Sequence, residues 1–337
     1  MAHYPADIHK PQKNSSIIHV EYIHVSVMLG DSGGGQQVIA TFPEFSDVTS
    51  ELQPEIQAFT HQFPDYSDFN FVSLQSWNID NGVQLAWLNQ NLVCQFRDYQ
   101  TGKSALSFLG NHQATQTAHT LLDQVQQANP TQPAQLELVP ESSLGDIPSD
   151  GTLQVVEDPD NFDYVISMPL LAKLEGSAFT NVRKAANTLQ KHNPDAQVHT
   201  VDLNDNQNHQ AMRDIFIQRE ETKAADYANE YLAFDRLLSL SLELGVTATG
   251  VMVENTLRAF IVYELSTDHQ AAGHFWKADT SYRGVYQFLM HSVAKELHSQ
   301  GVETMNIQQD LGLSGLRRAK QFLRPIQLLK KFTIRRA

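Results

Sequence analysis

One stretch, from His274 to Lys320, constrains the fold more than any other part of the sequence. It begins with a short strand pattern, turns at Gly284, and continues into a segment whose apolar residues recur every four positions, as on one face of a helix. These residues are Val285, Leu289, Val293 and Leu297. Gly301 is suited to end that helix, because a residue without a Cβ tolerates the left-handed conformation. A second strand over 303–308 and a helix from Ser314 complete a pattern that predicts an α/β unit.

The length of the chain favours two domains. At 337 residues it exceeds the usual size of a single domain, which is about 100–200 residues. Residues 140–163 contain seven acidic residues, no basic residue and several Pro, Gly and Ser, so we expect a domain boundary there. We therefore predict an N-terminal extension with a hairpin over 1–45, a first domain over 46–158, and a second domain over 159–337 that carries the site.

Within these domains the local patterns predict particular elements. A capping residue and an early proline favour a helix over 46–61. The aromatic segment 66–77 shows neither helical nor strand periodicity clearly, so we expect it to be semi-irregular. Helical periodicity over 208–245 predicts two helices that are interrupted near 224–229.

Charge is distributed unevenly along the chain. The net charge is −14, yet residues 313–337 contain eight Lys or Arg and no acidic residue. An acidic protein disfavours nucleic acid in general, whereas the basic end could hold phosphate locally. The alternative for this basic end is a solvated helix face followed by a basic edge strand.

The remaining composition narrows the compartment and the chemistry. Cys94 is the single cysteine and lies in an apolar run, which is typical of a small buried residue. No run approaches the roughly 18–20 apolar residues that span a bilayer, and the N-terminus lacks the apolar core of a secretory signal. We therefore expect a cytoplasmic protein. The histidines have no usual metal-ligand spacing, and we expect no metal site.

Three motifs follow one another between His274 and Lys320. They are His274-Phe275-Trp276-Lys277-Ala278, then Tyr282-Arg283-Gly284-Val285-Tyr286-Gln287, then Asn306-Ile307-Gln308-Gln309-Asp310-Leu311-Gly312 with Gly315-Leu316-Arg317-Arg318-Ala319-Lys320. In this order they resemble the C-terminal domain of phosphatidylglycerol lysyltransferases and its free-standing relatives. The resemblance extends roughly from Phe45 to the end. It implies an α/β fold of two tandem GNAT-like (acyl-CoA N-acyltransferase-like) domains, with mixed central sheets flanked by helices.

The sequence departs from the family pattern at charged positions. Trp276 replaces a Glu, Ile307 an Arg, Gln308 a Glu, and Lys184 an Asn. If the family's charged groups stabilise transfer, each loss could cost on the order of 2–4 kcal/mol. Trp276 and Tyr286 either line an apolar acyl pocket or pack in the core. The departures are compatible with a changed substrate or with lost catalysis.

Three residues are candidates for catalysis. Asp310 ends a predicted strand and could accept a proton from an attacking amine or hydroxyl, or it could cap the helix that begins at Ser314. Its place in the longest shared motif favours the functional role. Lys277 would hold the donor or developing negative charge. His274 is either a half-buried strand residue or a proton carrier.

The other candidates would bind substrate or anions. Arg317 and Lys320 are three apart on one helix face and would contact an anion, or pair with the acidic body of the protein. Arg283 and Gly284 precede a helix N-terminus, where amides favour anions. The family resemblance adds Arg183, Asn187 and Asn306, and Trp276 is a further candidate because it could line an acyl pocket. Bulky Tyr286 stands where GNAT enzymes have a small residue, which hinders close approach of a coenzyme A pyrophosphate.

These observations favour a transferase that moves an acyl or aminoacyl group to an amine or hydroxyl acceptor. No tightly bound cofactor is expected; acyl-CoA or aminoacyl-tRNA would be the donor co-substrate. The acceptor would be a small molecule or a lipid, and a tRNA would contact the basic C-terminal stretch. The alternative is a non-catalytic protein that keeps a degenerate transferase cleft for a phosphorylated or lipid ligand.

Overall fold

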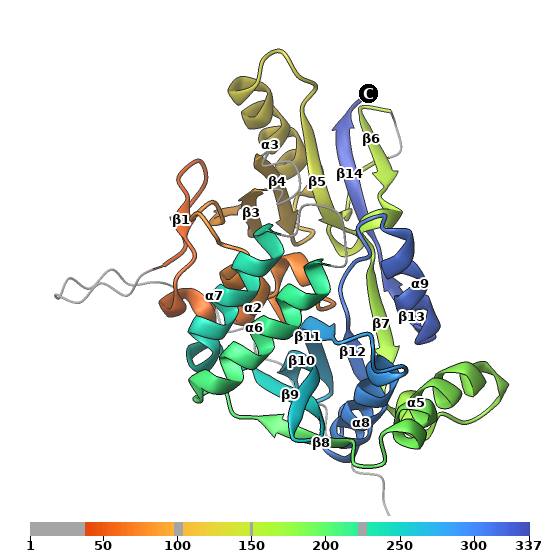
Figure 1. Ribbon diagram of the computed structural model, residues 1–337. Coiled ribbons are helices and arrows are strands. Elements are labelled where there is room, and N and C mark those ends of the chain that lie inside the picture. Colours follow the sequence, from red (N-terminus) through yellow and green to blue (C-terminus); the bar gives the residue numbers. More distant parts are fainter. Residues whose placement is uncertain (1–37, 98–103, 149–150, 222–227) are drawn as a thin grey trace, which may run out of the picture. The chain divides into compact units, whose positions relative to one another are not determined.

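A seven-stranded mixed sheet includes the two strands of the stretch from His274 to Lys320 (Figure 1). The structure is a computed structural model and describes residues 38–97, 104–148, 151–221 and 228–337. The strands of this sheet are β7 (Asp163–Ser167), β8 (Gln197–Val201), β9 (Thr247–Val253), β10 (Thr256–Thr267), β11 (Gln270–Ala278), β12 (Thr304–Asn306) and β13 (Gln327–Leu329). Their order is β13-β7-β12-β11-β10-β9-β8, and the β11–β12 pair is parallel.

Helices cover both faces of this sheet. One face packs against α8 (Val285–Ser299), which α4 (Met168–Lys173) and α5 (Thr180–His192) flank. The other face packs against α6 (Asn206–Glu221) and α7 (Ala228–Leu244). The apolar stripe of α8 is buried as its four-residue spacing predicts, and Gly301 ends the helix with a left-handed φ of 91°.

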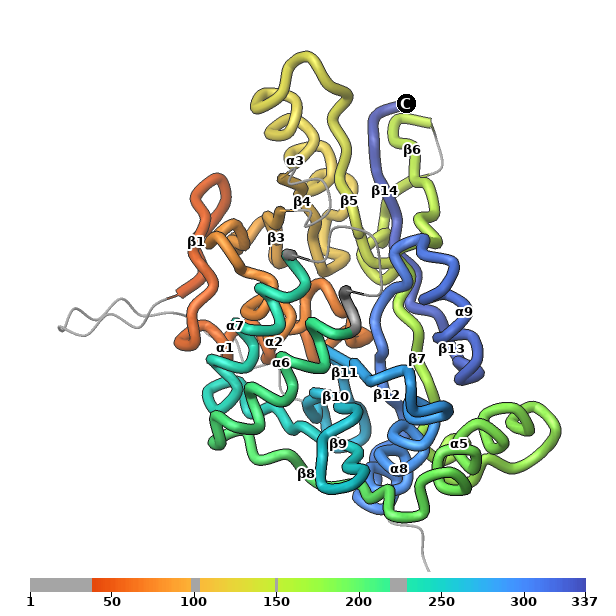
Figure 2. Tube along the Cα trace, viewed as in Figure 1, coloured from red at the N-terminus to blue at the C-terminus, as the bar shows by residue number. Residues whose placement is uncertain are grey.

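The first half of the chain forms a four-stranded antiparallel sheet. Its strands, in spatial order, are β1 (Ser46–Asp47), β2 (Gln84–Leu88), β3 (Asn91–Arg97) and β4 (Ser104–Leu109). Helices α1 (Gln53–Thr60) and α2 (Phe71–Ser76) belong to this half, and α2 packs against α7 of the second half (Figure 2). Helix α3 (Ala114–Ala128) covers a further apolar cluster.

A third sheet joins strands that are distant in sequence. It contains β5 (Gln135–Pro140), β6 (Leu153–Glu157) and β14 (Lys331–Arg336). Strand β14 lies between the other two and is antiparallel to both (Figure 2). Ile334 of β14 is fully buried in the same apolar cluster as Leu136 and Leu153. The last strand of the chain therefore completes a sheet whose other strands precede β7.

The predicted α/β fold class is confirmed: the described residues form a mixed central sheet and two antiparallel sheets with flanking helices. The two helices predicted over 208–245 are present as α6 and α7. The domain boundaries stay a prediction, and the hairpin predicted within 1–45 lies almost entirely outside the described residues. No helix in the described part of the chain has the length and apolar character required to cross a membrane.

Three local predictions were wrong. The helix predicted over 46–61 begins only at α1, because residues 46–47 pair with β2 as strand β1. Segment 66–77 is not irregular: it forms the 3₁₀ turn η2 (Ser67–Phe69) and then α2, whose N-cap Asn70 accepts a hydrogen bond from the Ser73 amide. The basic terminal strand β14 is central rather than an edge strand, since both of its sides are paired.

Candidate functional site

The parallel strands β11 and β12 part at a point that we call the fork. Their pairing ends at Ala272 and Asn306, whereas β11 continues over 273–278. Beyond β12 the chain turns to β7, where the Ile307 amide donates to the Tyr164 carbonyl. Among the described residues, the backbone groups of 273–276 that face away from β10 consequently have no strand partner.

A β-bulge places His274 at the fork. Val262 pairs with Phe275 and the next residue, Tyr263, pairs with Gly273, so His274 is the extra residue of β11. Only 1% of its side chain is exposed, although the residue as a whole is partly exposed, and its accessible part is therefore backbone. Bulges often redirect a side chain next to a functional site.

The imidazole of His274 is held by a buried carboxylate. Its Nε2 lies 3.2 Å from Oε1 of Glu264 on β10, and that oxygen also accepts a 2.7 Å hydrogen bond from Asn70. Its Nδ1 is buried and has no hydrogen-bond partner among the described residues. A histidine oriented by a carboxylate through one nitrogen can exchange a proton through the other.

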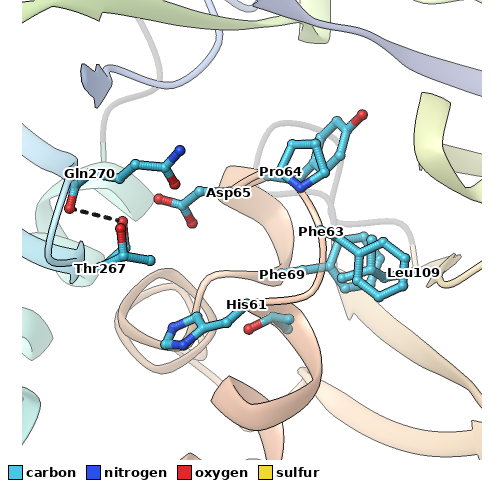
Figure 3. A pocket seen from close by; sticks show the side chains of 11 residues that line it. His61, Phe63, Pro64, Asp65, Phe69, Leu109, Thr267 and Gln270 are labelled. Atoms are coloured by element: carbon cyan, nitrogen blue, oxygen red, sulfur yellow. Dashed lines mark hydrogen bonds between the residues drawn. The ribbon is translucent and has the colours of Figure 1, made fainter. Parts of the chain in front are cut away.

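Asp65 lies beside this pair. Its carbonyl oxygen accepts a 2.6 Å hydrogen bond from the side chain of Asn306, the last residue of β12. The pKa of the Asp65 carboxyl is raised to about 6, chiefly by burial and also by the nearby charge of Glu264, against the opposing effect of hydrogen bonds from Ser266 and Asn70. Asp65 also lines a small cavity, shown in Figure 3.

A buried lysine connects the two halves of the chain below the fork. Lys331 of β14 is 0% exposed, donates to Asp163 of β7 at 2.8 Å, and pairs with Asp68 of η2. The amide of Ser67 donates to Asp163 at 2.8 Å, and Asn306 approaches the same carboxylate at 3.3 Å. The charges are thus compensated by close partners, as burial requires.

Asp310 is fully buried and saturated with hydrogen bonds. Its Oδ2 accepts from the Tyr164 hydroxyl at 2.6 Å and from Arg317 Nε at 2.7 Å. Its Oδ1 accepts from Arg317 Nη2 at 2.8 Å and from the Gly312 amide at 2.9 Å. Burial alone would raise the pKa of Asp310, but these donors outweigh it and lower that pKa. Four bonds use the lone-pair sites of a carboxylate, which favours a structural role over the base role. The side chain does not cap α9, whose N-cap is Leu313 without a side-chain hydrogen bond.

The two predicted anion contacts on α9 (Ser314–Phe322) bind groups of the protein itself. Arg317 pairs with Asp310 and also with Asp160, whose Oδ1 lies 2.6 Å from Nη2 of Arg317. Lys320 donates to the carbonyl oxygens of Ile307 and Gln308, and burial lowers its pKa to about 8. The two side chains share a helix face as predicted, and that face holds the loop after β12.

Lys277 and Trp276 point to different surroundings. The Nζ of Lys277 lies 2.8 Å from Glu230 of α7 and 4.3 Å from the ring centroid of Phe216. The ring of Trp276 packs against Tyr286 with centroids 5.2 Å apart. Its Nε1 is buried and has no hydrogen-bond partner among the described residues. Trp276 therefore packs at the start of α8 and keeps one unused donor.

The residues predicted at the helix N-terminus divide between two roles. Arg283 is exposed and, with Ser281, Tyr282, His192 and Asn193, lines an open hollow of about 470 Å³. Gly284 instead allows α5 to approach, because a Cβ there would overlap the carbonyl oxygen of Ala185. Arg183 of α5 donates to the Leu174 carbonyl, and Asn187 is exposed.

The sequence analysis named His274 and Asn306 as candidate site residues but missed their partners. Glu264, Asp65 and Asn70 surround His274, and Asp163 with Lys331 lies beneath. One signal was available for Glu264, which is the only acidic residue in the apolar strand LRAFIVYELST. A charge in such a strand needs a buried partner.

The chain belongs to the family described as phosphatidylglycerol lysyltransferase, C-terminal, whose model matches residues 140–335, more than half of its length. The predicted family is thereby confirmed. No curated protein matches the sequence.

Three solved structures share the fold. A conserved protein of unknown function from Bacteroides thetaiotaomicron is 23% identical, with a TM-score of 0.74 over 87% of this chain and 99% of that chain. The C-terminal domain of a putative lysylphosphatidylglycerol synthetase from Agrobacterium fabrum is 12% identical, with a TM-score of 0.57 over 86% and 93%. L-PGS from Bacillus licheniformis is 11% identical, with a TM-score of 0.56 over 89% and 94%.

Proposed function

We propose that the protein transfers an acyl or aminoacyl group to an amine or hydroxyl acceptor at the fork. The observation that carries this proposal is the edge of β11 over 273–276, which no described strand pairs, beside a buried His274–Glu264 pair. The family description names a lysyltransferase, which supports group transfer as the class of reaction. The donor would be an acyl-CoA or an aminoacyl-tRNA.

The unpaired edge supplies what a donor needs. An extended donor can add to an open strand edge through main-chain hydrogen bonds. Amides of 273–276 that face away from β10 would then lie near the reacting carbonyl. Backbone N–H groups fixed at such a point stabilise the negative charge that develops on the carbonyl oxygen.

His274 is the proposed general base. The acceptor nitrogen or oxygen forms a bond to the acyl carbon, and its proton passes to the free Nδ1 of His274. The bond to the leaving thiol or ribose hydroxyl then breaks, and His274 returns the proton to that group. Glu264 is a positioning residue, since it holds Nε2 and stabilises the protonated imidazole.

The second candidate is a binding protein without catalysis. It is favoured by the saturated hydrogen bonds of Asp310 and by the ion pair between Lys277 and Glu230. Both residues would then stabilise the fold, and the fork would hold a phosphorylated or lipid ligand.

The test combines acyl-CoAs or aminoacyl-tRNA with amine acceptors and anionic phospholipid vesicles, and detects product by mass spectrometry. His274→Asn should lower kcat by about 10²–10⁴, the usual contribution of a general base. His269→Asn, at an exposed histidine just before β11, should leave kcat within about twofold. Equal turnover in His274→Asn would overturn the role of His274. Ligand-induced thermal shifts without product in the native protein would support the binding protein instead.

A further inference from the structure

A cavity of about 30 Å³ lies where residues 60–69 meet the turn between β10 and β11 (Figure 3). Its walls include Asp65 from the first segment and Ser266, Thr267 and Gln270 from the second. A single water molecule requires a cavity of about 10–15 Å³, whereas the pockets of drug-sized ligands have volumes of about 300–1,000 Å³. The cavity therefore has room for one small head group.

The charge around this cavity is not balanced. Oδ2 of Asp65 is buried and has no hydrogen-bond partner among the described residues. Glu264, another buried carboxylate, raises the pKa of Asp65, whereas His274 and hydrogen bonds from Ser266 and Asn70 lower it without offsetting burial. No Lys or Arg is among the described residues that line the cavity. A buried carboxylate in this setting is stabilised by a proton or by a cationic ligand.

The lining also has the chemistry that a cation prefers. Phe63, Tyr66 and Phe69 contribute aromatic rings to the walls, and aromatic faces attract ammonium groups. Ser266, Thr267 and Gln270 add oxygen acceptors to that of Asp65. Within the described ranges no three His, Cys, Asp or Glu residues gather as metal ligands would. A primary ammonium group, with three N–H donors, matches this lining.

We infer that this cavity binds the ammonium group of a primary amine through Asp65. The cavity adjoins the His274–Glu264 pair through Asp65, but binding of an ammonium group there holds whether or not the chain catalyses transfer. Besides Glu264 and His274, the titratable residues near Asp65 are His61 and Tyr66, which line the same cavity.

Binding of this kind depends on pH. An ammonium group requires the ionised form of Asp65, whose pKa burial raises to about 6. Affinity should therefore be constant above that pH and should fall about tenfold for each pH unit below it.

Methylammonium chloride is the probe, and the melting temperature of the full chain is the readout. Sodium chloride at equal ionic strength and tetramethylammonium chloride, which exceeds the cavity, are the comparison salts. A ligand that binds only the folded state raises Tm in a concentration-dependent manner. At pH 7.5 methylammonium should raise the Tm of the native protein, and neither comparison salt should match it.

Two variants decide the outcome. Asp65→Asn keeps the size of the side chain and should abolish the methylammonium shift, and removing a buried charge leaves the fold intact. Asp268→Asn removes an exposed carboxylate and the same net charge, and should retain the shift. Phe63→Leu should weaken binding severalfold. A native protein without a specific shift, or equal shifts in Asp65→Asn and Asp268→Asn, would overturn the inference and leave the His274 proposal unaffected.

Discussion

At the scale of single residues, the most consequential side chain is a buried lysine. Lys331 has no exposed surface, and the attraction of Asp163 and Asp68 outweighs burial, so that its pKa is raised. Its neighbour Lys330 pairs with Glu157 at the surface. Substituting Lys331 and Lys330 in turn therefore compares what a buried and an exposed lysine contribute to the stability of the protein.

Lys331→Met should lower the free energy of unfolding by about 3–5 kcal/mol, because Asp163 and Asp68 lose their buried counter-charge. Lys330→Met should have a much smaller effect, since its ion pair is solvated. Urea denaturation followed by circular dichroism measures both. A Lys331→Met loss no larger than that of Lys330→Met would show that the buried pairs add little.

At the scale of elements, two glycines share a conformation and differ in surroundings. Gly284 before α8 has a φ of 90° and Gly301 after it has a φ of 91°. A Cβ would meet the backbone of Ala185 at Gly284, but nothing within 4 Å at Gly301. Helix α5 therefore rests directly on the backbone at the start of α8.

Gly301→Ala should cost about 1–2 kcal/mol from left-handed backbone strain alone. Gly284→Ala should cost that amount plus about 1–3 kcal/mol of overpacking against α5. Thermal denaturation of the two variants provides the comparison. Equal losses would mean that α5 moves aside without penalty.

Helix α9 tests the role of Asp310. Asp310→Asn removes the charge that Arg317 binds and should loosen the loop after β12, so amide hydrogen exchange over 311–322 should become faster. Arg318→Gln changes an exposed charge on the same helix and should leave exchange unchanged. Unchanged exchange in Asp310→Asn together with lost transfer would instead assign Asp310 to catalysis.

The local patterns explain which features could be predicted. The four-residue spacing of Val285 and Leu289 predicts α8, since one element's periodicity is written in its own sequence. The point where β11 and β12 cease to pair depends on how the two strands are aligned. The bulge at His274 likewise depends on the pairing of β11 with β10. Neither feature can be predicted from the sequence of β11 alone. Glu264 and Lys331 have their partners, His274 and Asp163, on other strands. Such pairs cannot be predicted from the local sequence around either residue.

At the scale of the whole molecule, β14 makes the first half depend on the last strand. Strands β5 and β6 do not pair with one another, since β14 lies between them. A fragment that ends at residue 158, the predicted domain boundary, would leave Leu136 and Leu153 without Ile334.

Such a fragment should lack a cooperative thermal transition, and adding residues 330–336 after a short turn should restore one, because β14 runs antiparallel to β6. Circular dichroism and NMR amide dispersion measure the difference. A shuffled version of the added segment is the control. Cooperative melting of the fragment without the added strand would show that residues 46–158 fold independently.

The position of β14 also affects events during translation. Glu157 at the end of β6 precedes Lys330 by 173 positions, so at a synthesis rate of about 5–20 residues per second β5 and β6 wait roughly 9–35 s for their middle strand. Through that interval the nascent polypeptide presents two unsatisfied strand edges outside the ribosome. Chaperones that shield such edges should therefore raise the yield of native protein more than they would for a chain whose sheets close in order of synthesis.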